Sequence, residues 1–229
     1  VTLTIQPSVT VMGAFDSAGR GMLVRGTLKA VGVVSHPITF TSVTTAGWRG
    51  LYFSGDQGGG QGYLRHSVIE HGGKDISYRA NIYLVNGADV EIWDSDILSA
   101  TRLNRTDYGL YAQDSRVVVS GTHFMGNGDA LEDRGLYADN TIVTLTHAVF
   151  RDNAGYPVEL TADSLGGSLV GNTFEGNHPN RVSIKRGALR SNVTLERGDG
   201  LEGYELNGAV TVGSGYTLTM QPAAVLLGN

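Results

Sequence analysis

Short segments with a similar sequence pattern recur along this chain at intervals of 22 to 31 residues. Each contains an apolar residue that belongs to a regular series: Leu51, Ile82, Leu110, Leu136, Val158 and Val182. A second apolar series follows the first five members: Ile69, Ile97, Phe124, Phe150 and Phe174. Between the two series, apolar and polar residues alternate at 89–93, 116–120 and 142–146. Because alternation with period two is typical of strands, each interval is predicted to hold three short strands.

Three short strands in each repeat predict a right-handed parallel β-helix. We expect an all-β, single-stranded coil with three parallel sheets and about eight or nine rungs, in which inward side chains stack ~4.8 Å apart. The whole chain, 1–229, is predicted to form one domain. It would have N-terminal rungs in 1–47, central rungs in 48–200 and a C-terminal rung in 201–229. The 33 glycines suit the tight turns that such a coil needs.

Asparagine recurs three residues after each phenylalanine of the second series, at Asn127, Asn153 and Asn177. This regular spacing would put the three side chains one above another at a turn of the coil. Stacked side-chain amides hydrogen-bond along the axis of such a stack. We therefore expect a structural asparagine ladder at this turn.

The phrase TLTIQP at Thr2–Pro7 returns as TLTMQP at Thr217–Pro222. In a β-helix, strands at the two ends present open edges that are templates for pairing. We expect the two segments to form the join between successive units. The residues of this join are Thr2, Leu3, Ile5, Pro7, Thr217, Leu218, Met220 and Pro222. The expected partners are a second copy of the chain, in a head-to-tail filament that does not close, or covalently linked neighbouring repeats.

Three further segments extend the pattern of the TLTIQP phrase: Val24–Gly32, Pro37–Ser42 and Trp48–Phe53. Together they resemble repeat modules of secreted and surface-anchored bacterial β-helix proteins, which share the pectin-lyase-like superfold. Ser8 and Ala223 depart from the resemblance, because that position usually holds glycine. The resemblance implies an extracellular or cell-surface location in a bacterium, and a structural role like that of an adhesin or a stalk.

Outward positions on the first strand of each repeat carry four tyrosines in succession and then a carboxylate. The residues of this column are Tyr52, Tyr83, Tyr111, Tyr137 and Glu159. Tyrosines one rung apart predict an aromatic strip, which suits the sugar rings of a polysaccharide or a protein partner. The loops at 74–80, 101–107 and 128–134 are expected to wall this strip. The alternative is that the tyrosines only stack on one another and stabilise the sheet.

Nucleic-acid, membrane and catalytic functions have little support in the sequence. With 17 basic and 22 acidic residues, the chain lacks the basic surface that binds phosphate backbones. No apolar run is long enough to insert into a membrane. The chain has neither the DD pair nor the GHG sequence of polygalacturonases, which belong to the same superfold. We therefore expect no catalytic residue and no cofactor.

A metal site is not expected either. His66 and His147 occupy equivalent turn positions, but they lie three rungs apart, about 14 Å, which is too far to share an ion. The acids Asp129, Glu132 and Asp133 lie in a loop beside the tyrosines. Three roles are open to them: acting on a substrate, binding a cation, or forming a solvated acidic loop. We favour the solvated loop.

Overall fold

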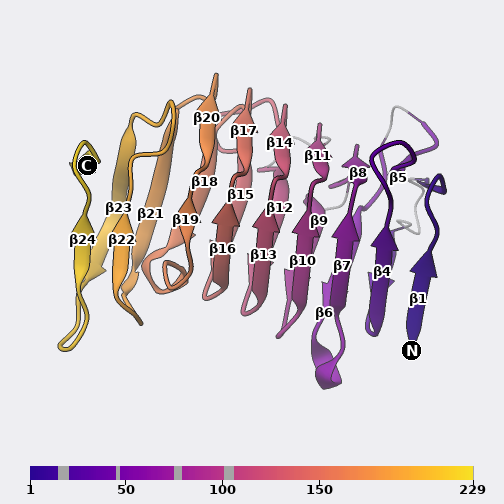
Figure 1. Ribbon diagram of the computed structural model, residues 1–229, viewed down its shortest axis with the longest axis horizontal. Coiled ribbons are helices and arrows are strands. Elements are labelled where there is room, and N and C mark those ends of the chain that lie inside the picture. Colours follow the sequence, from indigo (N-terminus) through magenta and orange to yellow (C-terminus); the bar gives the residue numbers. More distant parts are fainter. Residues whose placement is uncertain (15–20, 45–46, 75–78, 101–105, 229) are drawn as a thin grey trace.

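The computed structural model describes residues 1–14, 21–44, 47–74, 79–100 and 106–228, and it confirms the predicted parallel β-helix. Three parallel sheets follow a coil of about eight turns, with no α-helix in the described parts. Figure 1 shows strands stepping across the molecule from β1 near the N-terminus to β24 near the C-terminus. The described helices are single 3₁₀ turns, η1 (Asp56–Gly58) and η2 (Ala162–Ser164), and neither is long enough to cross a membrane.

The first sheet holds seven strands in chain order. They are β1 (Thr2–Ile5), β4 (Thr27–Val31), β7 (Gln61–Arg65), β10 (Asp89–Trp93), β13 (Arg116–Ser120), β16 (Ile142–Thr146) and β19 (Leu169–Val170). Equivalent strands of successive rungs pair in parallel, so that Val90 lies opposite Val117. Two later strands, β22 (Val193–Leu195) and β24 (Leu218–Met220), form a separate parallel pair.

The second sheet also holds seven strands. They are β2 (Thr10–Gly13), β5 (Ile38–Ser42), β8 (Ser67–Glu70), β11 (Asp96–Leu98), β14 (His123–Met125), β17 (Val149–Arg151) and β20 (Thr173–Glu175). Its inward column is the predicted second apolar series. Phe124, Phe150 and Phe174 stack there with successive ring centroids 4.7 and 5.5 Å apart.

The third sheet holds nine strands and carries the first apolar series on its inner face. They are β3 (Met22–Val24), β6 (Leu51–Ser54), β9 (Ala80–Val85), β12 (Tyr108–Gln113), β15 (Arg134–Asp139), β18 (Tyr156–Thr161), β21 (Arg181–Ala188), β23 (Gly203–Thr211) and β25 (Leu226–Gly228). Leu110 and Leu136 pair across β12 and β15, and both are fully buried.

A file of buried asparagines lies at the corner between the second and third sheets. The Nδ2 of Asn127 donates to Oδ1 of Asn153 over 3.0 Å, and the Nδ2 of Asn153 donates to Oδ1 of Asn177 over 2.8 Å. Asn81 extends the file, since its Nδ2 lies 3.3 Å from Oδ1 of Asn127. Each amide also bonds backbone groups of the turn, so the file satisfies polar groups that have no partner in a sheet.

The other two corners are closed by hydroxyl groups, which the sequence analysis missed. Between the first and second sheets, the N–H of Ser67 donates to Oγ of Ser95 over 3.1 Å. Between the third and first sheets, the N–H of Thr141 donates to Oγ of Ser164 over 3.0 Å. All four residues are buried. Each corner of the coil thus has its own column of side chains that bond the backbone of the next rung.

The repeated phrase forms the same strand and turn in both places. Pro7 and Pro222 are each followed by a residue in the left-handed region, with φ of 67° at Ser8 and 66° at Ala223. In both copies the N–H after that residue donates to the carbonyl of the glutamine before the proline, at 3.4 and 3.0 Å. Proline followed by a positive φ defines a type II turn, a turn in which glycine at the second central position is free of steric strain.

The likeness of the two copies ends after the turn. The strand that follows Ser8, β2, pairs with β5 in the second sheet. The strand that follows Ala223, β25, pairs with β23 in the third sheet. The likeness of the two segments therefore covers the strand and the turn alone.

Replacing Ala223 by glycine is expected to raise the free energy of unfolding by about 0.5–1 kcal/mol, because glycine adopts positive φ without steric strain. The measurement is urea unfolding of the wild type and the variant. Ala224→Gly is the matched control, because Ala224 has no positive φ and the extra backbone freedom should lower stability. A lower stability for Ala223→Gly would contradict the assignment of strain to this turn.

Candidate functional site: a tyrosine groove on the third sheet

The four predicted tyrosines form one column on the outer face of the third sheet. Tyr52 pairs with Tyr83, Tyr83 with Tyr111, and Tyr111 with Tyr137, on β6, β9, β12 and β15. All four side chains are half-buried, while the residues on either side of each tyrosine point into the core. Glu159 of β18 is the next member of the column.

The rings of this column stack face to face. Ring centroids are 5.5 Å apart for Tyr52 and Tyr83, 4.5 Å for Tyr83 and Tyr111, and 5.1 Å for Tyr111 and Tyr137. The interplanar angles are 25°, 8° and 17°. The strip therefore presents ring edges and hydroxyl groups outward, because the ring faces are turned toward one another along the coil axis.

A fifth tyrosine, Tyr108, completes the aromatic cluster and was missed in the sequence. Its ring meets Tyr111 edge-on at 5.2 Å and lies tilted against Tyr137 at 5.5 Å. Strict alternation from Tyr111 would turn Tyr108 inward, and for this reason the alternating pattern does not predict that Tyr108 lies on the outer face. The signal that could have found it is positional, because Tyr108, Arg134 and Tyr156 begin three successive strands and pair across them.

A buried ion pair ends the tyrosine column. The Nη2 atom of Arg134 lies 3.1 Å from Oε2 of Glu159, and the two side chains are only 13% and 8% exposed. Ser183 donates its hydroxyl to the same carboxylate over 3.1 Å, and the Lys185 ammonium lies 3.5 Å from its other oxygen. The Lys185 ammonium also sits 5.4 Å from the ring centroid of Tyr137. Glu159 is thus held by three side chains and packed against the aromatic cluster.

A second carboxylate lies two rungs farther along the column, at Glu205. It accepts from the Tyr156 hydroxyl over 2.8 Å and from Arg181 over 3.1 Å. Hydrolysis of a glycoside needs one carboxyl group that gives up a proton and one that is free to act as base or nucleophile. Glu159 and Glu205 are each tied to a guanidinium group and a hydroxyl, which is the arrangement of a structural ion-pair network.

Three hydroxyls of the cluster, those of Tyr108, Tyr111 and Tyr137, stay protonated well above neutral pH. Burial raises the pKa of Tyr108, Tyr111 and Tyr137, and for Tyr137 the nearby Asp139 carboxylate acts in the same direction. A protonated phenol both donates and accepts hydrogen bonds. These three side chains therefore offer neutral hydrogen-bonding groups throughout the physiological range.

These side chains line a hollow of about 380 Å³. Its lining residues are Arg79, Tyr83, Thr106, Tyr108, Tyr111, Glu132, Arg134, Tyr137, Glu159 and Lys185, and we call it the tyrosine groove. Of the loops expected to wall it, residues 75–78 and 101–105 lie outside the described residues. The described parts of all three loops reach the lining: Arg79 from 74–80, Thr106 from 101–107, and Glu132 and Arg134 from 128–134.

The acids of that third loop differ in role, so the favoured prediction of a solvated acidic loop is wrong for Asp133. Asp133 is fully buried, and its carboxylate accepts the backbone N–H groups of Asp107, Asp129 and Ala130 at 2.7 to 2.8 Å. It therefore fixes the loop. Across the described residues, no group of three or more His, Asp or Glu side chains is arranged to hold a metal ion.

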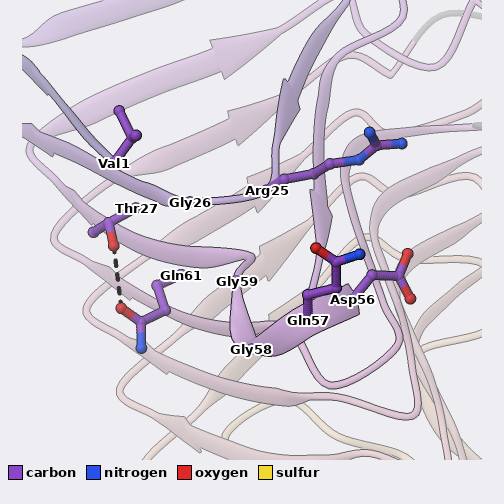
Figure 2. Close-up of a pocket in the computed structure, with 9 residues that line it drawn as sticks. All are labelled: Val1, Arg25, Gly26, Thr27, Asp56, Gln57, Gly58, Gly59 and Gln61. Atoms are coloured by element: carbon purple, nitrogen blue, oxygen red, sulfur yellow. Dashed lines mark hydrogen bonds between the residues drawn. The ribbon is translucent and has the colours of Figure 1, made fainter.

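A larger hollow, of about 710 Å³, lies beside the glycine-rich loop that contains η1, and Figure 2 shows its lining. Thr27 donates to Oε1 of Gln61 over 3.1 Å at one side, and Arg25 and Asp56 lie at the other. A Cβ at Gly59 would come within 1.7 Å of the Arg25 carbonyl oxygen, so glycine is required for the loop to pack here. Close packing of the loop thus accounts for Gly59 without a ligand.

No protein-family profile matches the chain, and searches of curated proteins and of solved structures give no significant match. What is established is the parallel β-helix and the geometry of the groove on its third sheet. The resemblance to bacterial surface modules rests on the residues that carry it.

Tyr204 of β23 is expected to make the free energy of unfolding fall at alkaline pH. The residue is 2% exposed, its hydroxyl donates to the Glu196 carbonyl over 2.7 Å, and burial raises its pKa to about 12. Because the folded-state pKa exceeds the ordinary value of 10.0, this contribution is complete below about pH 10 and is lost as the pH rises toward 12.

We expect Tyr204→Phe to flatten the alkaline fall of the unfolding free energy by up to ~1.4 kcal/mol per pH unit. Urea unfolding at stepped pH values measures this slope. An identical slope in the wild type and the variant would show that Tyr204 does not keep its proton in the folded chain.

Proposed function

We propose that this chain is a structural module of a bacterial cell surface or extracellular filament, one unit in a head-to-tail series of β-helices. The observation that carries the proposal is the repeated strand and type II turn, found in β1 and again in β24. A series of identical units would repeat one strand and one turn in this way. The likeness of Val24–Gly32 and Trp48–Phe53 to bacterial surface modules supports the extracellular setting.

The pairing within the coil supports head-to-tail growth. Successive rungs pair in parallel and in register along the sheets, as between β10 and β13. A further rung can be added by the same hydrogen bonds and the same stacking of inward side chains. Within the described residues, β1 pairs only with β4 and β24 only with β22. In a covalent series, the TLTIQP strand of the following unit would take the place of the TLTMQP strand, and the next rung would pair with its open edge.

A tandem protein tests this proposal. Residues 1–216 are joined to residues 2–229, so that the second unit begins where the repeat predicts. We expect a single rod whose maximum dimension in small-angle scattering is about twice that of the single chain, and whose second β2 segment joins the second sheet. Two flexibly linked units that unfold separately would contradict the proposal. Sedimentation of the single chain at rising concentration would show whether separate copies also stack.

A second function, polysaccharide binding, is favoured by the tyrosine groove. Its hollow of about 380 Å³ is lined mainly by hydroxyl, guanidinium, ammonium and carboxylate groups. Sites for polar ligands combine a concave surface with a few placed polar groups. We propose binding without cleavage, because Glu159 and Glu205 are tied into ion pairs. Binding of the wild-type chain to immobilised oligosaccharides tests it, and a chain that binds none of them would remove this function.

A further inference from the structure

The stacked tyrosines in the middle of the column, Tyr83, Tyr111 and Tyr137, have no free ring face for a sugar. Tyr83 is stacked between Tyr52 and Tyr111, and Tyr111 between Tyr83 and Tyr137. The remaining face of Tyr137 meets the Lys185 ammonium, 5.4 Å from the ring centroid. A sugar that binds by stacking needs an accessible aromatic face. Stacking of this kind is therefore blocked along the middle of the column.

What the column does present is a row of phenol hydroxyls, one for each rung. The hydroxyl of Tyr111 donates to Oε1 of Gln113 over 3.1 Å. Ring centroids 4.5 to 5.5 Å apart set the spacing of this row along the coil axis. A linear chain of sugars repeats its hydroxyl groups along its length, so it can meet such a row edge-on.

The charged groups around the row nearly cancel. Three cations, Arg79, Arg134 and Lys185, face two carboxylates, Glu132 and Glu159, a formal difference of one positive charge. Arg134 and Lys185 both lie within ion-pair distance of Glu159. A groove for a polyanion would carry a larger excess of unpaired cations, since each anionic unit needs a partner. The balance favours an uncharged ligand.

We propose that the tyrosine groove recognises an uncharged linear oligosaccharide through hydrogen bonds to the edges of its tyrosines. This inference rests on the polysaccharide-binding function proposed above. The phenol hydroxyls of Tyr83 and Tyr111 are the main contacts, and the groups of Arg134 and Glu159 are held in fixed positions at the end of the row. The rings serve as supports that keep the hydroxyls at a regular spacing.

The test compares loss of the hydroxyl with loss of the whole ring. Isothermal titration uses cellohexaose, chitohexaose, xylohexaose and, as the charged probe, hexagalacturonate. The wild type is expected to bind at least one neutral hexasaccharide. Tyr111→Phe should weaken that binding about 5- to 10-fold and Tyr83→Phe with Tyr111→Phe more than 10-fold, because each lost hydrogen bond costs ~1 kcal/mol. Tyr111→Ala should weaken it at least as much as Tyr111→Phe.

The matched control is Tyr63→Phe, which removes the hydroxyl of a tyrosine that is 40% exposed on the first sheet. Its affinity should equal that of the wild type, and thermal unfolding of every variant shows that the coil is intact. If the phenylalanine variants bind as the wild type does while Tyr111→Ala does not, recognition uses ring faces: the edge-on inference fails and the binding function stands. Binding of hexagalacturonate alone overturns the uncharged ligand. A wild type that binds none of the four probes overturns both proposals.

Discussion

Asn153→Ala is expected to lower the free energy of unfolding by about 4 kcal/mol or more, because one buried amide satisfies several groups at once. Its Nδ2 donates to the Phe124 carbonyl and to Oδ1 of Asn177, and its Oδ1 accepts from both the N–H and the Nδ2 of Asn127. The residue is fully buried, so water cannot replace the lost partners. Each buried polar group left without a partner costs ~1–3 kcal/mol.

Urea unfolding, followed by circular dichroism, measures the effect of Asn153→Ala. The control is Asn192→Ala, since Asn192 is exposed and its Oδ1 accepts a bond from the Thr217 N–H over 2.9 Å. We expect the control to lose less than ~1 kcal/mol. Similar losses in the two variants would mean that the asparagine file only fills space at its corner.

The spacing of apolar residues was enough to predict the coil, because every rung must fill the same cross-section. Leu110, Leu136 and Val158 are adjacent in the third sheet, as their intervals of 26 and 22 residues predicted. The asparagines stood out for the same reason, since few residue types can bond both the next side chain and the turn. Serine and threonine at the other corners carried no such signal, because the same residues are common on exposed strands.

The groove was predictable only in part. Alternation from Leu51 turned Tyr52 outward, and the in-register column followed from the rung spacing. The orientation of the rings was beyond that reasoning, because it depends on side-chain packing across rungs. The ion pair between Arg134 and Glu159 joins two positions that are not equivalent in the repeat, so no periodic pattern indicates it.

The apolar interior should tolerate change much less than the outer column. Phe150→Ala is expected to lower the free energy of unfolding by about 3–5 kcal/mol. Phe150 is fully buried, with Phe124 stacked at 4.7 Å and Phe174 at 5.5 Å on its two faces. The backbone around it belongs to strands held at fixed spacing by hydrogen bonds on both sides. Neighbouring rungs therefore cannot close the cavity, which favours the upper part of the range.

Tyr111→Ala provides the comparison, because Tyr111 is also stacked on both faces but is half-exposed on the outside of the coil. Its loss should cost only about 1 kcal/mol, since no closed cavity forms and water reaches the site. Urea unfolding of both variants with unchanged dependence on denaturant gives the two values. Equal losses would mean that the coil relaxes around Phe150 as freely as its surface does, and the rung spacing would then not be the rigid element of this fold.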